Sequence, residues 1–338
     1  MRRASILTFL SVALLAPNIS AAAPKKAAPP PVCAGRDIFT EMKRTDPEGY
    51  ASIRAAADAT PNARALLWRI EGKGQPTSYL FGTMHSTDER VNKRSPKVVE
   101  AFNAAKTVAL EYLESESPME KLGELIAAKG IYTEGNGLKD LLTPAELDTL
   151  RKSLAAEGIP TEAAHMLRPW FAGLALAISA CERKRTEAGL LALDKRLEKD
   201  AIAQGKQLVG LETPGLQIDA LMGMPDEAQI KLLKGSVATL HQRDDALEVL
   251  HRAYLGRDLG ITLPLSKRLI ERAGQDASAI DTVERDIAVK RNYGMRDASL
   301  PLLERGGAFI AVGALHLLGQ EGLVELLRAA GYTVTPVE

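Results

Sequence analysis

Short runs of apolar residues bounded by turn residues predict six β-strands along the chain. The runs cover residues 66–71, 78–85, 107–111, 207–212, 308–313 and 332–337. Runs of this length that are rich in β-branched and aromatic residues are typical of strands. Residues 72–76 contain two glycines and a proline, which indicates a loop, so the first two runs predict a β-hairpin.

The chain between the third and fourth strands has a helical pattern over residues 117–203. Within it, Pro169–Cys181 is apolar on all sides, which predicts a helix buried inside the protein. Only about a dozen apolar residues precede the charged run Glu182–Arg185, fewer than the roughly 20 that span a bilayer. Helical periodicity also covers residues 33–59 and, with breaks, residues 225–303.

Strands at both ends and a helical middle predict an α/β or α+β fold. We expect a central mixed sheet assembled from the N- and C-terminal parts of the chain, with a large helical insertion around residues 117–203. A chain of 338 residues can form one large domain or two, because single cores stop growing at roughly 250–300 residues.

The N-terminal residues have the pattern of a secretory signal peptide. Two arginines are followed by an apolar run and then by small residues, which predicts a signal peptide over residues 1–23. Residues 24–32, rich in Pro, Ala and Lys, predict a disordered linker. We therefore expect an exported protein, periplasmic or secreted, without stable membrane insertion after signal cleavage.

Composition and charge narrow the possible partners. With 46% hydrophobic and 25% charged residues, the composition is that of an ordinary globular protein. The 43 basic and 43 acidic residues balance, which gives no electrostatic reason to expect nucleic acid or an anionic membrane as a partner. The chain has two cysteines, Cys33 and Cys181. In an oxidising compartment we expect them to form a disulfide that ties the N-terminal segment to a central helix.

Polar side chains that can carry chemistry stand at the ends of four predicted strands. They are His85, Glu111, Glu212 and His316. In open sheets, ligand sites lie beyond the carboxyl ends of the strands. Both histidines belong to a G-x-x-H motif, in which Gly82 and Gly313 let the backbone approach a neighbouring group without a Cβ in the way.

Two imidazoles and the Glu111 carboxylate are ligands that suit zinc, manganese or other first-row divalent metals. The alternative is that each histidine is a hydrogen-bonded structural residue and that Glu212 caps the helix after it. The sequence contains no H-E-x-x-H, P-loop, G-x-G-x-x-G or G-x-S-x-G motif, which removes the common zincin, nucleotide-binding and serine-hydrolase interpretations.

Several segments together resemble the TraB/GumN family. They are LLWRIEG, SYLFGTMHSTDERV, TVALE, RPWFAGLALA, LALDKRL, QLVGLET, KRNYGM and GAFIAVGALHLLGQEGLVELLRAAGYTVTPV, in order from about Leu66 to Val337. The FGTMH segment and the last segment are the most specific. The resemblance implies a single domain over residues 33–338.

Members of that family share paired G-x-x-H motifs and a strand-end glutamate, which match His85, His316 and Glu111. By position, Arg291 and Asn292 match the Arg-Asn pair of the family, and Glu212 lies in the segment that matches its GLE sequence. The family is related to the TIKI proteins, which are described as metal-dependent proteases. It is related more distantly to erythromycin-esterase-like and haem-uptake proteins of similar fold.

The resemblance implies an exported metal-dependent hydrolase, peptidase- or esterase-like, that acts on a peptide or a small molecule. His85 and His316 would hold a divalent ion (Mn, Co or Zn), and Glu111 would ligate the ion or act as general base on its water. Arg291 would stabilise developing oxyanion charge or bind a substrate carboxylate.

Three other hypotheses stay open. One is a metal-free hydrolase with His85 as general base, oriented by Glu111. The others are a haem-type ligand-binding protein and an accessory envelope protein without turnover. The oligomeric state is left open.

A shared site makes a geometric prediction. The strands that carry His85, Glu111 and His316 must lie side by side, with their carboxyl ends at one pocket and Arg291 at its rim. The two histidines must also lie within about 10 Å of each other, because metal bonds of roughly 2 Å bridge no larger gap.

Overall fold

The structure is a computed structural model that describes residues 31–338 except 73, 114–122, 125–127, 136 and 157–158. Residues 31–338 form one compact unit. The signal peptide predicted over residues 1–23 and most of the linker predicted over residues 24–32 lie outside the described residues. Among the described helices, none is long and apolar enough to cross a membrane.

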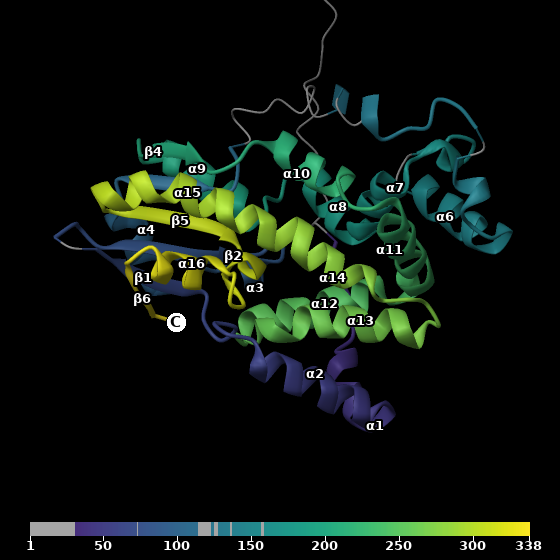
Figure 1. The fold of residues 1–338 in the computed structure, drawn as a ribbon, viewed down its shortest axis with the longest axis horizontal. Helices are drawn as coiled ribbons and strands as arrows, with labels where there is room; N and C mark the ends of the chain where they lie inside the picture. Colours follow the sequence, from purple (N-terminus) through teal and green to yellow (C-terminus); the bar gives the residue numbers. More distant parts are fainter. Residues whose placement is uncertain (1–30, 73, 114–122, 125–127, 136, 157–158) are drawn as a thin grey trace, which may run out of the picture. The chain divides into compact units, whose positions relative to one another are not determined.

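A six-stranded mixed sheet forms the centre of this unit, in the order β4-β3-β5-β2-β1-β6 (Figure 1). The strands are β1 (Leu67–Glu71), β2 (Ser78–Thr83), β3 (Thr107–Leu110), β4 (Gln207–Gly210), β5 (Ala308–Gly313) and β6 (Thr333–Pro336). β2, β5, β3 and β4 are parallel neighbours, and β1 runs antiparallel to both β2 and β6. The prediction of a mixed sheet built from the two ends of the chain is confirmed.

Helices cover both faces of the sheet (Figure 1). On one face, α4 (Pro96–Ala104) and α9 (Leu193–Ala203) pack on the side chains of Phe309 and Ala311. On the other face, α15 (Lys290–Arg305) and α16 (Leu323–Ala329) pack on Ile310 and Val312. Successive residues of β5 thus point to opposite sides, and both sides are buried, as the continuous apolar run 308–313 predicts.

The remaining described helices lie beside the sheet, and many of them form three further apolar clusters. They are α1 (Ile38–Thr45), α2 (Pro47–Ala59), α3 (Glu89–Asn92), α6 (Pro144–Ala156), α7 (Pro169–Ala177), α8 (Ala180–Glu187), α10 (Pro214–Met222), α11 (Asp226–Thr239), α12 (Arg243–Leu255), α13 (Thr262–Arg272) and α14 (Ala279–Val283). One cluster joins α6, α7 and α11, a second joins α1, α2, α12 and α13, and a small third joins α13 and α14. Short 3-10 turns η2 (Gly137–Asp140), η3 (Ala164–Met166), η4 (Leu240–Gln242), η5 (Leu259–Ile261) and η7 (Ala314–Leu317) connect them. A π-helical segment, η6 (Glu284–Val289), joins α14 to α15.

The prediction of one buried helix over Pro169–Cys181 is wrong. The helix ends at Ala177, and α8 begins a new one at Ala180. Ser179 precedes α8 and its hydroxyl accepts a hydrogen bond from the Glu182 amide at 3.1 Å, which is the N-cap that starts the second helix. Ile178, between the two helices, is 52% exposed.

The disulfide Cys33–Cys181 is present and joins the segment before α1 to α8. The Arg185 guanidinium of α8 donates a further hydrogen bond to the Pro31 carbonyl oxygen at 2.9 Å. The N-terminal end of the described chain is therefore fixed to α8 both covalently and by a hydrogen bond.

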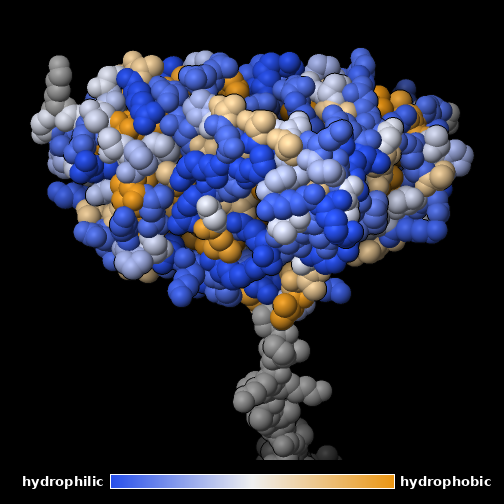
Figure 2. All heavy atoms as spheres, turned by 90° about the horizontal axis from the view of Figure 1, so that it is seen from below, coloured by the Kyte–Doolittle hydropathy of each residue, from blue (hydrophilic) through white to orange (hydrophobic). Residues whose placement is uncertain are grey.

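The surface seen from below in Figure 1, where α1 and α2 lie, is mainly hydrophilic (Figure 2). Apolar residues on this face stand in small separate groups between polar ones. Scattered apolar residues are normal on a protein surface and do not mark an interface.

Candidate functional site

Three predicted site residues follow strands that are direct neighbours. β5 lies between β3 and β2 and is parallel to both. Glu111 follows β3, His85 follows β2, and His316 follows β5. Because the carboxyl ends of parallel strands meet at one edge of a sheet, the fold brings all three to the same edge. The predicted arrangement of these strands is confirmed.

Gly313 marks the point where the three side chains come together. A Cβ on this residue would lie 2.9 Å from Glu111 Oε1, 3.6 Å from His316 Cδ2 and 3.9 Å from His85 Nε2. Both imidazoles are thus within 4 Å of one point, well inside the 10 Å limit. The first of these distances is too short for a real Cβ, so only glycine lets the carboxylate approach the backbone.

Gly82 allows a second close approach. A Cβ there would lie 2.7 Å from Leu317 Cδ1 and 3.1 Å from Ala314, both in η7. The absence of a side chain at Gly82 therefore lets η7, which carries His316, pack directly on β2.

Glu111 is buried and its carboxylate accepts hydrogen bonds on both oxygens. Oε1 accepts from the Gly313 amide at 2.5 Å, and Oε2 accepts from Arg291 Nη2 at 3.1 Å and from Gln217 Nε2 at 3.2 Å. Burial by itself would raise the pKa of Glu111, but the imidazoles, the guanidinium and the amide together hold its pKa below the usual value. Glu111 is therefore a carboxylate at neutral pH.

His316 lies in η7 and is 8% exposed. Its Nδ1 is 2.7 Å from Asn292 Oδ1, and Asn292 Nδ2 donates to the Glu321 carbonyl oxygen at 2.8 Å. With the amide oriented in this way, its oxygen accepts the proton of Nδ1, which leaves a lone pair on Nε2. Nε2 is 3.7 Å from Glu111 Oε1. Burial lowers the pKa of His316 to about 4, so the ring is neutral at pH 7.

His85 has the opposite environment, because its side chain is 61% exposed. Its Nδ1 lies 2.6 Å from Oδ2 of Asp194 in α9, and Asp194 also accepts a hydrogen bond from Thr83 Oγ1. The Asp194 charge raises the pKa of His85 to about 9. The carboxylate that orients His85 is thus Asp194, and the hypothesis that Glu111 does so is wrong.

Arg291 lies at the start of α15 and connects two glutamates. Its Nε and Nη2 donate to Glu212 Oε2 at 3.0 Å and 2.6 Å, and Nη2 also donates to Glu111. Nη1 donates to the Ile287 carbonyl oxygen at 3.1 Å, within the π-helical segment η6. The side chain is only 11% exposed, so the prediction of Arg291 at the pocket rim is wrong. The guanidinium binds the carboxylates of Glu111 and Glu212, and both side chains are buried.

The Glu212 carboxylate lies beside Arg291 because β3 and β4 continue to run side by side beyond their last strand residues. The Leu211 amide donates to the Leu110 carbonyl oxygen, and the Glu212 amide donates to the Glu111 carbonyl oxygen at 2.7 Å. Burial raises the pKa of Glu212. Its carboxylate binds Arg291, and α10 begins after Thr213 without a side-chain cap.

The segment after His85 is held by α8. Glu182 accepts hydrogen bonds from the Ser86 hydroxyl, the Thr87 amide and the Thr87 hydroxyl, at 2.9, 2.9 and 2.7 Å. Arg185 donates to the Thr87 hydroxyl and carbonyl oxygens. Ser86 also contacts Nε2 of the buried His251 at 2.8 Å. These groups fix the backbone that carries His85.

Sequence reasoning missed Asp194, Gln217 and Glu182. Asp194 lies in LALDKRL, one of the segments that resemble the TraB/GumN family, and this was a signal that could have identified it. Gln217 and Glu182 lie on helices whose register against the sheet is set by tertiary packing, so strand-end reasoning could not reach them.

The donor set fits a metal ion in part. Both histidines have Nδ1 bound to an oxygen acceptor and Nε2 facing the Gly313 edge, which is the usual arrangement of metal-ligating imidazoles. Glu111 Oε2 accepts from both Arg291 and Gln217, whereas Oε1 accepts from the Gly313 amide and keeps a second lone pair. Within the described ranges, no group of three or more His, Cys, Asp or Glu side chains is arranged to hold a metal.

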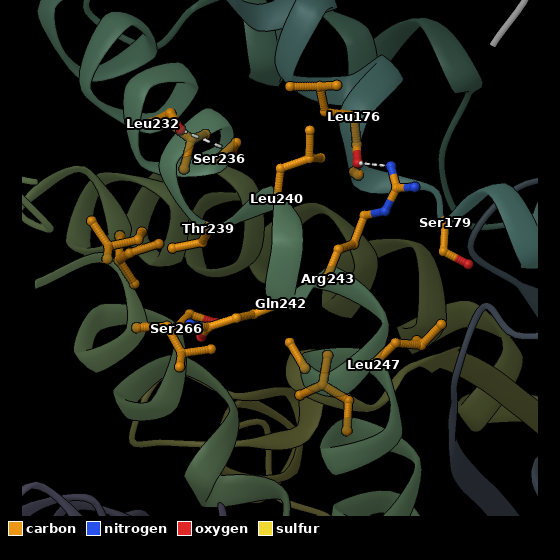
Figure 3. A pocket seen from close by; sticks show the side chains of 16 residues that line it. Leu176, Ser179, Leu232, Ser236, Thr239, Leu240, Gln242, Arg243, Leu247 and Ser266 are labelled. Carbon is orange, nitrogen blue, oxygen red and sulfur yellow. Dashed lines mark hydrogen bonds between the residues drawn. The ribbon is translucent and has the colours of Figure 1, made fainter. Parts of the chain in front are cut away.

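A pocket of about 300 Å³ lies elsewhere, among α7, α11, α12 and α13 (Figure 3). Its lining is largely aliphatic, and Arg243 in its wall donates to the Leu176 carbonyl oxygen at 3.1 Å. Its described lining residues include none of the predicted site residues and no histidine. It therefore gives no support to a haem site held by two histidines.

Comparison with known proteins identifies the family of the chain. A profile described as the TraB/PrgY/gumN family matches residues 66–336. The chain is also similar to a protein of Amphimedon queenslandica named Metalloprotease TIKI homolog, at 23% identity over 338 residues. That match covers 85% of this chain and 64% of the relative, so the chain spans less than two thirds of the relative's length. No solved structure matches the chain significantly. Because the profile covers most of the chain, including both G-x-x-H motifs and Glu111, the chain belongs to the TraB/PrgY/gumN family.

Proposed function

We propose that this protein is an exported metal-dependent hydrolase that cleaves peptide bonds at the sheet edge around Gly313. One observation carries the proposal: His85 and His316 reach the same edge, each with Nδ1 bound to an oxygen acceptor and Nε2 left to bind a ligand. The name of the relative, a metalloprotease homologue, supports a peptide as substrate.

In this proposal His85 and His316 hold a divalent ion, Mn, Co or Zn. Such an ion supplies a water whose pKa is lowered to about 7, which makes it a nucleophile at neutral pH. Glu111 contributes negative charge beside the two imidazoles, and Arg291 and Gly313 keep that carboxylate ionised and in place. Arg291 is thus a positioning residue rather than an oxyanion donor.

We also propose that the protein acts outside the cytoplasm, in the periplasm or as a secreted protein. The Cys33–Cys181 disulfide supports this location, because disulfides persist in oxidising compartments and are rare in the cytosol.

The experiment compares hydrolysis of a peptide library by the purified chain with Mn²⁺, Co²⁺ or Zn²⁺ and with EDTA, together with elemental analysis of the bound metal. We expect activity to need metal, and His85→Ala and His316→Ala each to lose both metal and activity. His241→Ala, which changes an exposed histidine in η4, is the control and keeps both. Metal binding and activity that survive in both site variants would refute the proposal.

A second candidate is metal-free hydrolysis by acid–base catalysis. The observation in its favour is that the two histidines have pKa values shifted in opposite directions, which is typical of an acid and a base in one site. Here His316 is the base and the His85 cation is the acid. Full activity in EDTA, lost in both His variants, would select this mechanism.

A further inference from the structure

A pocket of about 610 Å³ opens beside the candidate site. Its walls come from α2, from η5 and α13, from the helix formed by α14, η6 and α15, and from η7. Asn292 and His316 belong to its lining, so one end of the pocket reaches the His316–Asn292 pair. A pocket of this size can enclose a ligand of several residues or a drug-sized molecule.

Several aliphatic side chains form part of this lining, beside polar and charged ones. They include Leu263, Pro264, Val283, Ile287, Val289 and Leu315. The first five are half-buried and Leu315 is 37% exposed, so each presents apolar surface that a ligand could cover. Covering such surface is favourable by about 25 cal/mol per Å². The pocket is therefore suited to aliphatic groups.

Two cations and three carboxylates, Glu48, Glu271 and Glu284, line the pocket, and both cations are paired. Lys267 pairs with Asp281, and Arg268 binds Asp46 with 2.7 Å between Nε and Oδ2. Paired cations attract an anion weakly, because their charge is neutralised nearby. The charge distribution thus favours an uncharged ligand segment over an acidic one.

The wall between α2 and η5 is closely packed. A Cβ on Gly260 of η5 would lie 2.7 Å from the Ala57 carbonyl oxygen, so the two backbones touch. The Asp46–Arg268 ion pair joins the start of α2 to α13 on the same side. Such contacts hold the wall in one shape. Binding therefore does not cost the free energy of ordering the wall, and a fixed shape discriminates between ligands.

From these observations we infer that the pocket binds aliphatic side chains of the peptide substrate, next to the bond that is cleaved at His316 and His85. This inference rests on the proposed function, which supplies the peptide bond that is cleaved. The pocket then determines which peptides bind. Because His316 lines one end of the pocket, residues near the cleaved bond would reach it, and leucine-type side chains match its aliphatic surface.

The test measures binding separately from turnover. The probes are blocked, fluorescently labelled hexapeptides of identical length, one rich in leucine and one rich in serine. Their binding to the His85→Ala protein is followed by fluorescence anisotropy, and hydrolysis is followed on the wild-type protein. We expect the leucine peptide to bind at least about tenfold more tightly, which is about 1.4 kcal/mol, since the pocket buries leucine side chains and not serine ones.

Two variants locate the binding. Ala56→Trp places a large ring in the pocket lining from the exposed face of α2, and Val283→Asp puts a carboxylate among the aliphatic side chains. Both should weaken binding of the leucine peptide about tenfold or more and leave the serine peptide unchanged. The matched control is Ala55→Trp, at the neighbouring exposed position of α2 outside the lining, which should change neither.

The outcomes separate this inference from the proposed function. Leucine-selective binding that Ala56→Trp abolishes would support the pocket even if no peptide is hydrolysed. Equal binding of the two peptides, or equal effects of Ala55→Trp and Ala56→Trp, would overturn it. Octanoate that displaces the leucine peptide and binds as tightly as it does would overturn the assignment to a peptide.

Discussion

The two histidines of the candidate site have contrasting surroundings. His316 is buried and bound to a neutral amide, whereas His85 is exposed and bound to the Asp194 carboxylate. Burial keeps the His316 ring neutral, and the Asp194 carboxylate favours the cation of His85. At neutral pH, without metal, the edge therefore carries one neutral and one charged imidazole.

Asp194→Asn should lower the pKa of His85 from about 9 toward 6.5 in the metal-free protein, since the carboxylate charge is the largest cause of the shift. The folded-state pKa is raised, so the pair's contribution to stability is complete below about pH 6.5 and is lost as the pH rises through 9. NMR titration of the imidazole measures the pKa, and thermal melts between pH 6 and 10 measure the stability. A His85 pKa that stays near 9 in the variant would contradict this account.

Gly313→Ala should disturb the site, because the added methyl group would lie 2.9 Å from Glu111 Oε1. Overpacking of this kind costs about 1–3 kcal/mol, and moving the carboxylate should also lower activity. Gly294→Ala in α15 is the control, since a Cβ there meets nothing within 4 Å. The control should be neutral or stabilising by about 0.4–1 kcal/mol in chemical denaturation.

At the scale of elements, α8 supports the site without contributing a reacting group. It carries Glu182 and Arg185, which hold the Ser86–Thr87 backbone directly after His85. Glu182 is 8% exposed and Arg185 is 9% exposed, so these charge-assisted hydrogen bonds are shielded from water. The position of α8 is thus coupled to the position of His85.

Glu182→Gln should destabilise the protein by about 2–4 kcal/mol, because it weakens three buried hydrogen bonds to one carboxylate. It should also reduce activity by displacing His85. Glu187→Gln, at an exposed position of the same helix, should leave both unchanged. Urea unfolding and a peptide-hydrolysis assay give the two readouts, and equal behaviour of the two variants would disprove the coupling.

Strand ends were the part of the site that the sequence could reveal. Apolar runs locate β2, β3 and β5, and the polar residue after each run is His85, Glu111 or His316. The break between α7 and α8 was missed because the apolar composition hid the cap at Ser179. The partners Asp194 and Gln217 come from helices that pack from elsewhere in the chain, and a single sequence does not encode that register in any local pattern.

At the scale of the whole molecule, the two ends of the described chain are fastened in different ways. The N-terminal segment is held by the disulfide, while the C-terminal residues enter the sheet, where β6 pairs with β1. The prediction of a sheet from sequence-distant parts succeeded because both ends carry runs with strand patterns. The order β4-β3-β5-β2-β1-β6 needs tertiary information, since the apolar runs alone do not specify which strands are neighbours.

Replacing both cysteines, as Cys33→Ser with Cys181→Ser, should lower stability. The bond spans 148 residues, and the chain-entropy model gives about 5 kcal/mol for a loop of this length, often less in practice. Thermal unfolding with and without dithiothreitol measures the effect. The reductant should lower the Tm of the wild-type protein and leave the Tm of the double variant unchanged. A wild-type Tm that is insensitive to the reductant, with the bond shown to be reduced, would contradict the prediction.

The place of β5 has a consequence for the order in which the molecule can be made. This strand lies between β3 and β2 in the sheet, yet it is the fifth of the six strands along the described chain. A nascent chain emerges from the ribosome N-terminus first, so β2 and β3 lack their shared neighbour until β5 has been synthesised. Pairing across such a distance is slow, because long loops must close first. A protein proposed to leave the cytoplasm would thereby keep an incomplete sheet, and stay fit to pass through a translocation channel, until β5 has been synthesised.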